Sequence, residues 1–361
     1  MSDKNLIECL GQAGLRYIQD KRTWNDVAKK LVVEFYGARG ESKQGCVVAL
    51  KKSARHALSY LPAAGLIPKP NRPKGVSVII RVKNEEDWLE TSIRSLIGFA
   101  DEIIVGDNGS TDKTPETLEN LRREYPEILR VYSLPDLDIL ALTNHLIDET
   151  SYRWIARWDA DFVAQTDGTH NISNLKERLF NLPDNRYFFF YLYMVEVAGD
   201  FWHQNPRHPT RADAHLWTAS PALRYVYDPT GYESPRVPIW YEVNRWEQPN
   251  FYHMHIKSDE RLFQSFVWKN YLTRTNADAR LTPAEFEREF YRRRFGSEDA
   301  DNAMASYMLE YLNELIPLQA GRYPNYPALI KPFLDRPRYR IIYKKGKIIG
   351  RENLAVSKQG R

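Results

Sequence analysis

Two short apolar segments place the strongest constraint on the fold. Residues 76–82 read VSVIIRV, and residues 102–107 read EIIVGD. Uninterrupted β-branched and apolar residues over this length are typical of strands buried on both faces, which occur mainly in parallel sheets. Leu89, Ile93 and Leu96 lie between the two segments at helical spacing. This alternation predicts a parallel sheet whose strands are joined by helical crossovers.

The alternation continues along the chain. Thr114 and Pro115 mark the start of a second helix, because proline is favoured in the first helical turn. A third strand is predicted at residues 130–133 and a fourth at residues 154–158. We therefore expect several parallel strands to end at one edge of the same sheet.

Polar residues follow three of these strands. Glu85 lies just after the first, Asp107 ends the second, and Asp159 and Asp161 follow the fourth. Ligands of open α/β sheets bind at the carboxyl ends of the strands. Two carboxylates at this spacing can serve one hard cation such as Mg²⁺ or Mn²⁺, which typically takes one or two protein carboxylates beside a diphosphate. The sequence therefore predicts an acidic ligand site at this edge.

Weaker patterns cover the second half of the chain. Strands are predicted at residues 187–197, in short pieces at 215–243, and at 250–256, where His253 and His255 share one face. Further predicted elements are helices at residues 259–271, 283–294 and 299–315 and a hairpin around Gly346.

Three motifs in residues 75–163 carry a family resemblance. They are Lys83-Asn84-Glu85 after the first strand, DNGSTDKT at residues 107–114, and Asp159-Ala-Asp161. Their order and spacing resemble the opening of family 2 glycosyltransferases of the GT-A fold, which carry a D-x-D motif. The resemblance implies transfer of a sugar from a nucleotide-diphosphate sugar, such as a UDP- or GDP-sugar, with inversion and with Mn²⁺ or Mg²⁺ as cofactor.

The resemblance also implies roles for single residues. Val82, Glu85 and Asp107 would line the base and ribose pocket, and Asp159 would face the ribose or the metal. Asp161 would bind the metal, and His253 resembles a late histidine that completes the metal site in some relatives. Many relatives have proline followed by threonine or valine where this chain has Arg81-Val82. Arg81 is therefore a candidate phosphate contact or a surface residue.

The catalytic Glu-Asp pair of the family has no clear counterpart. Glu233, in a Gly-Tyr-Glu turn, is the favoured base, and Asp213 and Asp259 are the alternatives. A base of this kind would deprotonate the acceptor hydroxyl as it attacks the anomeric carbon. The acceptor is expected to be a glycan, a glycolipid or a similar molecule, in cell-surface polysaccharide or lipopolysaccharide synthesis.

The predicted fold class is α/β, with a Rossmann-like, mostly parallel GT-A sheet flanked by helices. A proline-rich stretch at residues 66–75 suggests a boundary, so we assign residues 1–70 to a helical N-terminal extension. Residues 71–270 are assigned to the glycosyltransferase domain, and 271–361 to a helical and hairpin region with a basic tail.

Charge is unevenly distributed. Residues 336–361 hold nine Lys or Arg and one acid, while the whole chain carries a net charge of +4. Such a tail suits an anionic partner, and we favour peripheral contact with membrane headgroups over nucleic acid. No apolar run reaches the roughly 20 residues of a membrane span. With no secretory signal evident and only Cys9 and Cys46 present, we expect a protein of the cytoplasm or of the inner face of the membrane.

Two other functions stay open. A sugar-phosphate nucleotidyltransferase shares this type of core, but a glycine-rich phosphate loop usually follows its first strand, and Arg81–Glu85 contains no glycine. A carbohydrate- or nucleotide-binding protein that kept the fold and lost catalysis is compatible with the missing Glu-Asp pair.

Overall fold

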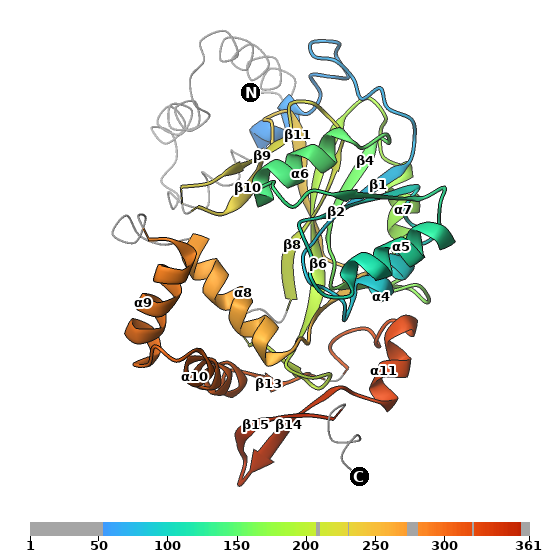
Figure 1. Cartoon of the computed structure of the whole chain (residues 1–361). Coiled ribbons are helices and arrows are strands. Elements are labelled where there is room, and N and C mark those ends of the chain that lie inside the picture. The colour runs from blue at the N-terminus through green and yellow to red at the C-terminus, as the bar shows by residue number, and fades with distance from the viewer. Residues whose placement is uncertain (1–52, 207–209, 230, 273–280, 320, 355–361) are drawn as a thin grey trace, which may run out of the picture.

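The computed structural model describes residues 53–354, except 207–209, 230, 273–280 and 320, and it describes only the backbone of residues 210–213 and 272. Figure 1 shows a central sheet with helices on both faces and a mainly helical C-terminal region beside it. Most of the predicted N-terminal helical extension lies outside the described residues, and residues 53–58 are helical. The predicted domain boundaries near residues 70 and 270 stay a prediction.

The first half of the chain builds the parallel part of the sheet. Its elements are β1 (Val76–Val82), α4 (Leu89–Ser95), β2 (Glu102–Asp107), α5 (Thr114–Glu124), β3 (Leu129–Ser133), α6 (Ile139–Asp148) and β4 (Trp154–Asp159). β1 lies between β2 and β4, and β3 pairs with the outer side of β2, all in parallel. This is the predicted crossover arrangement, because each crossover contains a helix.

The second half extends the sheet to the order β3-β2-β1-β4-β8-β6-β12-β5, with β11 also paired to β6. Its elements are β5 (Phe162–Ala164), α7 (Ile172–Phe180), β6 (Tyr187–Ala198), β8 (Thr210–Thr218), β11 (Tyr241–Trp246) and β12 (Phe251–His255). β8 is antiparallel to both β4 and β6, whereas β11 and β12 run parallel to β6. The predicted α/β class with a mostly parallel sheet is confirmed.

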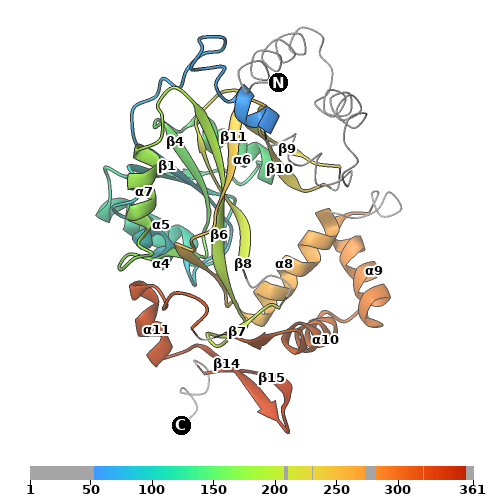
Figure 2. The same ribbon diagram turned by 180° about the vertical axis from the view of Figure 1, so that it is seen from behind.

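The remaining elements form two hairpins and a C-terminal layer (Figures 1 and 2). They are β7 (His203–Gln204), β9 (Arg224–Tyr227), β10 (Glu233–Arg236), α8 (Asp259–Leu272), α9 (Pro283–Phe295), α10 (Ala300–Asn313), β13 (Ile316–Pro317), the 3-10 turn η1 (Ala328–Ile330), α11 (Lys331–Asp335), β14 (Tyr339–Lys344) and β15 (Lys347–Asn353). Predicted strands and helices of this half coincide with the observed ones to within a few residues.

Alternating residues of the strands feed two cores. One face of the sheet packs against α4, α5 and α7, with Val78, Ile80 and Trp158 buried in it. The other face packs against α6 through Ile79 and Ile104. Apolar burial on both faces explains why the β1 and β2 sequences are continuous rather than alternating.

Two polar residues near helix starts bind loops instead of capping helices. α4 begins at Leu89, and Asn84, which follows β1, adopts a left-handed backbone with φ 56°. Thr114 is the first residue of α5, as predicted. Its hydroxyl accepts a hydrogen bond from the Glu85 amide at 2.9 Å. Both side chains therefore fix loops rather than helix ends.

The structure also bears on membrane insertion. Among the residues described, no helix combines the length and the apolar composition needed to cross a bilayer.

A close helix–sheet contact at Gly106 yields a stability test. A Cβ at Gly106 would lie 2.7 Å from Leu142 Cδ1 of α6. We expect Gly106→Ala to lower the free energy of unfolding by about 1–3 kcal/mol through overpacking. Leu142→Ala should cost about 2–5 kcal/mol by leaving a cavity. Because each change relieves the other, urea denaturation of the double variant should show a loss smaller than the sum. Strict additivity would contradict this packing.

Candidate functional site

The carboxyl ends of β1, β2 and β4 meet at one edge of the sheet. Val82 pairs with Asp107 on one side, and Arg81 pairs with Asp159 on the other. The register therefore places one predicted acid on each side of the end of β1, Asp107 on β2 and Asp159 on β4. The Val82 side chain is only 3% exposed and belongs to the core, and its predicted place in the base and ribose pocket stays a prediction.

The loops after β1 and β2 are joined by hydrogen bonds from the DNGSTDKT motif. Ser110 Oγ accepts from the Asn84 amide at 2.9 Å, and Asn84 Oδ1 accepts from the Thr111 amide at 2.7 Å. Asp107 Oδ1 accepts from the amide and the hydroxyl of Ser110. The polar side chains of the motif thus hold the loop that presents Asp107 and the loop that carries Glu85 in one arrangement.

A buried lysine links two of the predicted site residues. Lys257 Nζ donates to Glu85 Oε1 at 2.6 Å and lies 2.8 Å from Asp161 Oδ2. Arg261 also contacts Glu85, at 3.1 Å. Burial alone would raise the pKa of Asp161, but Lys257 and His253 outweigh it and hold that pKa well below its usual range. Burial is the larger effect at Glu85, whose pKa is raised despite Lys257.

His253 lies on the other side of the same carboxylate. Its Nε2 is 3.2 Å from Asp161 Oδ2, and its Nδ1 is 3.6 Å from Glu196 of β6. Burial alone would lower the pKa of His253, but the Asp161 carboxylate raises it to about 10. Asp161, His253 and Glu196 therefore form a row of alternating charge, with Glu196 behind the imidazole.

A second cluster lies on the face covered by α6. Glu233 of β10 pairs with Arg81 and with Arg157, the latter at 3.1 Å, and accepts from the Thr143 hydroxyl at 2.9 Å. Asp159 lies 3.6 Å from Arg81 and 3.9 Å from Arg157. Arg81 and Arg157 thus lie between the carboxylates of Glu233 and Asp159, and Asp159, at the end of β4, is the more exposed of the two.

The three predicted base candidates lie in different surroundings. Glu233 is held by two arginines and a threonine, as above. Asp259 begins α8 and pairs with Arg351. Asp213 lies in β8, and its side chain is outside the described part. The backbone register gives its position. β8 is antiparallel to β4, and His215 pairs with Arg157. Asp213, two residues before His215, therefore lies at the same edge of the sheet as Asp159, two residues after Arg157.

Sequence reasoning missed Lys257, Arg157 and Glu196. A signal existed for two of them, because strand residues two apart share a face. Arg157 precedes Asp159 by two residues in β4, and Lys257 follows His255 by two residues, just past the end of β12. Nothing in the sequence around Glu196 points to His253, since the two strands meet only through the sheet.

The residues around Asp161 can be tested for fit to a divalent cation. In the part of the chain described, no group of three or more His, Cys, Asp or Glu is placed to hold one. Asp161 and His253 nevertheless supply two facing donors, and a carboxylate behind a metal-binding histidine is the usual supporting arrangement. A site completed by substrate phosphates needs no more protein donors. The donors therefore fit, but Lys257 holds the same Asp161 oxygen.

Comparisons with known proteins give one family and several solved structures. Residues 77–209 match the family described as Glycosyl transferase family 2. No curated protein gives a significant match. A crystal structure of S. aureus TarS is 15% identical over 66% of this chain and 48% of the TarS chain, with a TM-score of 0.36. The chain thus spans about half the length of that protein.

Two further structures were solved with ligands. S. aureus TarS 1-349 in complex with UDP-GlcNAc is 15% identical, over 76% of this chain and 95% of that one, with a TM-score of 0.36. The mannosyltransferase PcManGT from Pyrobaculum calidifontis, in complex with GDP-Man and Mn²⁺, is 15% identical over 47% and 54%, with a TM-score of 0.30. Likenesses this low assign no donor and no acceptor to this chain.

The shared Asp161 oxygen predicts competition between Lys257 and a cation. Removing the ammonium group in Lys257→Met should raise the affinity for Mn²⁺, without nucleotide, by about tenfold or more, because a like charge is lost at contact distance. Electron paramagnetic resonance of free Mn²⁺ measures this directly.

Arg261→Met is the matched control, because it removes a charge from Glu85 without touching Asp161. Its Mn²⁺ affinity should stay close to that of the unmodified protein. Equal affinities in the Lys257 variant and this control would contradict the competition.

Proposed function

We propose that this chain is a glycosyltransferase that moves a sugar from a nucleotide-diphosphate sugar to a hydroxyl of a glycan or glycolipid, because residues 77–209 match the family described as Glycosyl transferase family 2. The observation that carries the donor assignment is the meeting of Asp107 and Asp159 at the end of β1, with Asp161 two residues after Asp159. Such an edge is the usual ligand site of an open α/β sheet.

We assign the donor to this edge as follows. Asp107, held by Ser110, accepts hydrogen bonds from the base, and Asp159 accepts from a ribose hydroxyl. Arg81 and Arg157, which lie close to Asp159, offer guanidinium groups to the diphosphate, which planar bidentate donors match well. Glu85 is held by its ion pair with Lys257 and orients the loop that follows β1.

We propose that Asp161 and His253 hold a divalent cation, Mn²⁺ or Mg²⁺, with Glu196 fixing the imidazole. When bound, such a cation neutralises the charge that develops on the departing diphosphate. Lys257, which contacts both Glu85 and Asp161, would give up Asp161 to such a cation and keep Glu85.

The base must take the proton of the acceptor hydroxyl. Its oxygen forms a bond to the anomeric carbon, while the bond from that carbon to the diphosphate breaks and the electron pair leaves with the phosphate oxygen, inverting the centre. Glu233 and Asp259 are engaged with arginines. We propose as the base Asp213, whose strand β8 is antiparallel to β4 and begins at the end that carries Asp159. Glu233 and Asp259 are the alternatives.

An exposed aromatic surface lies next to Glu233 and suits the acceptor. Tyr227 and Tyr232 of the β9–β10 hairpin are exposed, as is Trp268 of α8, which stacks on Tyr271 at 5.3 Å. Lys269 Nζ lies 5.7 Å from the centre of the Tyr232 ring, and both views show the hairpin beside the end of α8 (Figures 1 and 2). Flat rings with a polar edge are well suited to stacking on sugars. A glycan acceptor of this kind fits cell-surface polysaccharide synthesis on the cytoplasmic side of a membrane.

Nucleotide binding tests the donor assignment. We expect one of UDP, GDP, ADP and CDP to raise the melting temperature, more strongly with Mn²⁺ than without, since a ligand of the folded state stabilises it. Asp107→Asn and Asp161→Asn should each reduce the shift. A shift of equal size for all four nucleotides, unchanged in both variants, would exclude this edge as the donor site.

A pair of variants separates the base from the structural carboxylate. Asp213→Asn should lower kcat for transfer by about a hundredfold or more, while the nucleotide-induced thermal shift persists. Glu233→Gln should instead lower the melting temperature, because it leaves Arg81 and Arg157 without their carboxylate. Full transfer by Asp213→Asn would return the role to Glu233 or Asp259. Donor binding without transfer in the unmodified protein would support a catalytically inactive binding protein.

A further inference from the structure

The β14–β15 hairpin carries an unusual combination of exposed side chains. Ile342, Tyr343 and Ile349 are 37%, 47% and 52% exposed. Lys344 and Lys347 face each other across the strands next to the turn at Gly346, and the intervening Lys345 is exposed as well. We propose that this hairpin docks the protein on an anionic lipid surface.

The hairpin is positioned to reach such a surface. Figures 1 and 2 show it projecting from the C-terminal region, away from the central sheet. Branched apolar residues beside lysines are the composition of elements that lie in a membrane interface. Lysines at that depth are attracted to anionic headgroups.

Its base is fixed to the body of the protein. The Ile341 amide donates to Asp200 Oδ2 at 2.9 Å, and His203 bridges Asp200 and the Tyr343 hydroxyl, at 2.5 and 2.6 Å. Arg351 donates to the carbonyl oxygen of Gly199 at 2.9 Å. The hairpin is therefore held in one orientation, with its basic end outward.

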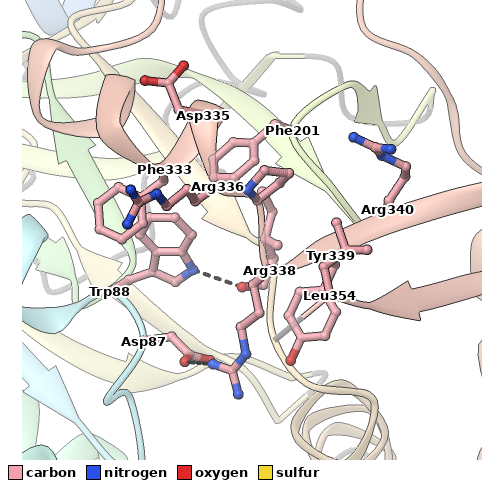
Figure 3. A pocket seen from close by; sticks show the side chains of 12 residues that line it. Asp87, Trp88, Phe201, Phe333, Asp335, Arg336, Arg338, Tyr339, Arg340 and Leu354 are labelled. Atoms are coloured by element: carbon pink, nitrogen blue, oxygen red, sulfur yellow. Dashed lines mark hydrogen bonds and ion pairs between the residues drawn. The ribbon is translucent and has the colours of Figure 1, made fainter. Parts of the chain in front are cut away.

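A pocket at the start of the same strand adds cationic surface. This cavity of about 530 Å³ is lined by Trp88, Phe201, Phe333 and Tyr339 together with Arg336, Arg338 and Arg340. Arg338 pairs with Asp87 (Figure 3). Asp87 and Asp335 also line this pocket, so its three arginines exceed its acids by one, and the pocket carries a small excess of positive charge next to the hairpin.

Lysines at the end of a hairpin can also have two different roles. On short outer strands they prevent edge-to-edge pairing, and on many surfaces they bind nucleic acid. Neither role requires large apolar side chains to be exposed beside them. Ile342 and Ile349 therefore favour a lipid surface, into which apolar groups can insert.

Vesicle co-sedimentation of the full chain tests the proposal without any nucleotide or acceptor. The probe is phosphatidylcholine vesicles with and without phosphatidylglycerol. We expect binding only to the anionic vesicles, and we expect Lys344→Glu/Lys345→Glu/Lys347→Glu to weaken it by about tenfold or more. The control Lys69→Glu/Lys74→Glu/Lys113→Glu makes the same change of charge at exposed positions elsewhere and should retain most of the binding.

A second variant separates lipid from other polyanions. Ile342→Ser/Ile349→Ser should also weaken vesicle binding, because the inserted apolar groups are lost, while its melting temperature stays unchanged. Binding to neutral vesicles as strong as to anionic ones, or equal losses in the hairpin and control variants, would overturn the proposal. So would unchanged vesicle binding by the serine variant together with binding of single-stranded RNA. Because no donor is present, failure here leaves the proposed transferase function intact.

Discussion

The ion pairs around Lys257 are the interaction on which the site depends. One ammonium group lies between Glu85, which follows β1, and Asp161, which follows β4, with both carboxylates buried. Taking three charges out of water is unfavourable unless each keeps its partner. The loops after β1 and β4 and the end of β12 are therefore fixed relative to one another by charge as well as by the apolar packing of Trp88, Val163 and Ile256. The same feature means that a cation at Asp161, as we propose, would compete with Lys257 for one carboxylate oxygen.

Local patterns were enough to predict the frame of this site. The apolar runs of β1 and β2 and the polar residues at their ends depend on neighbours within a few positions, so the sequence showed both the strands and the edge where Asp107 and Asp159 meet. The DNGSTDKT motif was also visible, although its structural part was not. Thr114 lies at the predicted start of α5, and both it and Asn84 tie the loops after β1 and β2 together. Their hydrogen bonds join residues 27 to 29 positions apart, beyond the reach of a capping pattern.

Charge pairing across the sheet could not be predicted in the same way. Glu233 stood out by its glycine turn, yet its partners Arg81 and Arg157 lie 152 and 76 residues away. Lys257 meets Glu85 over a separation of 172 residues. These long-range pairs bear on the choice of base, because a carboxylate paired with arginines is less available to accept a proton from an acceptor hydroxyl. The pairing of β4 with β8 placed the backbone of Asp213 at the same edge of the sheet as Asp159, which the sequence did not show.

Arg351 connects the β14–β15 hairpin to the cluster around Lys257. It belongs to β15, it is almost fully buried, and it donates to the backbone carbonyl of Lys257 at 2.8 Å while pairing with Asp259 at the start of α8. The hairpin that we assign to the lipid surface is thus bonded to the residue that holds Glu85 and Asp161 together. A lipid surface that bound the hairpin would therefore set the orientation of the Lys257 backbone, and of the edge of the sheet beside it, relative to the membrane. An acceptor carried by a membrane would then meet a donor site whose orientation to that membrane is set by the fold itself.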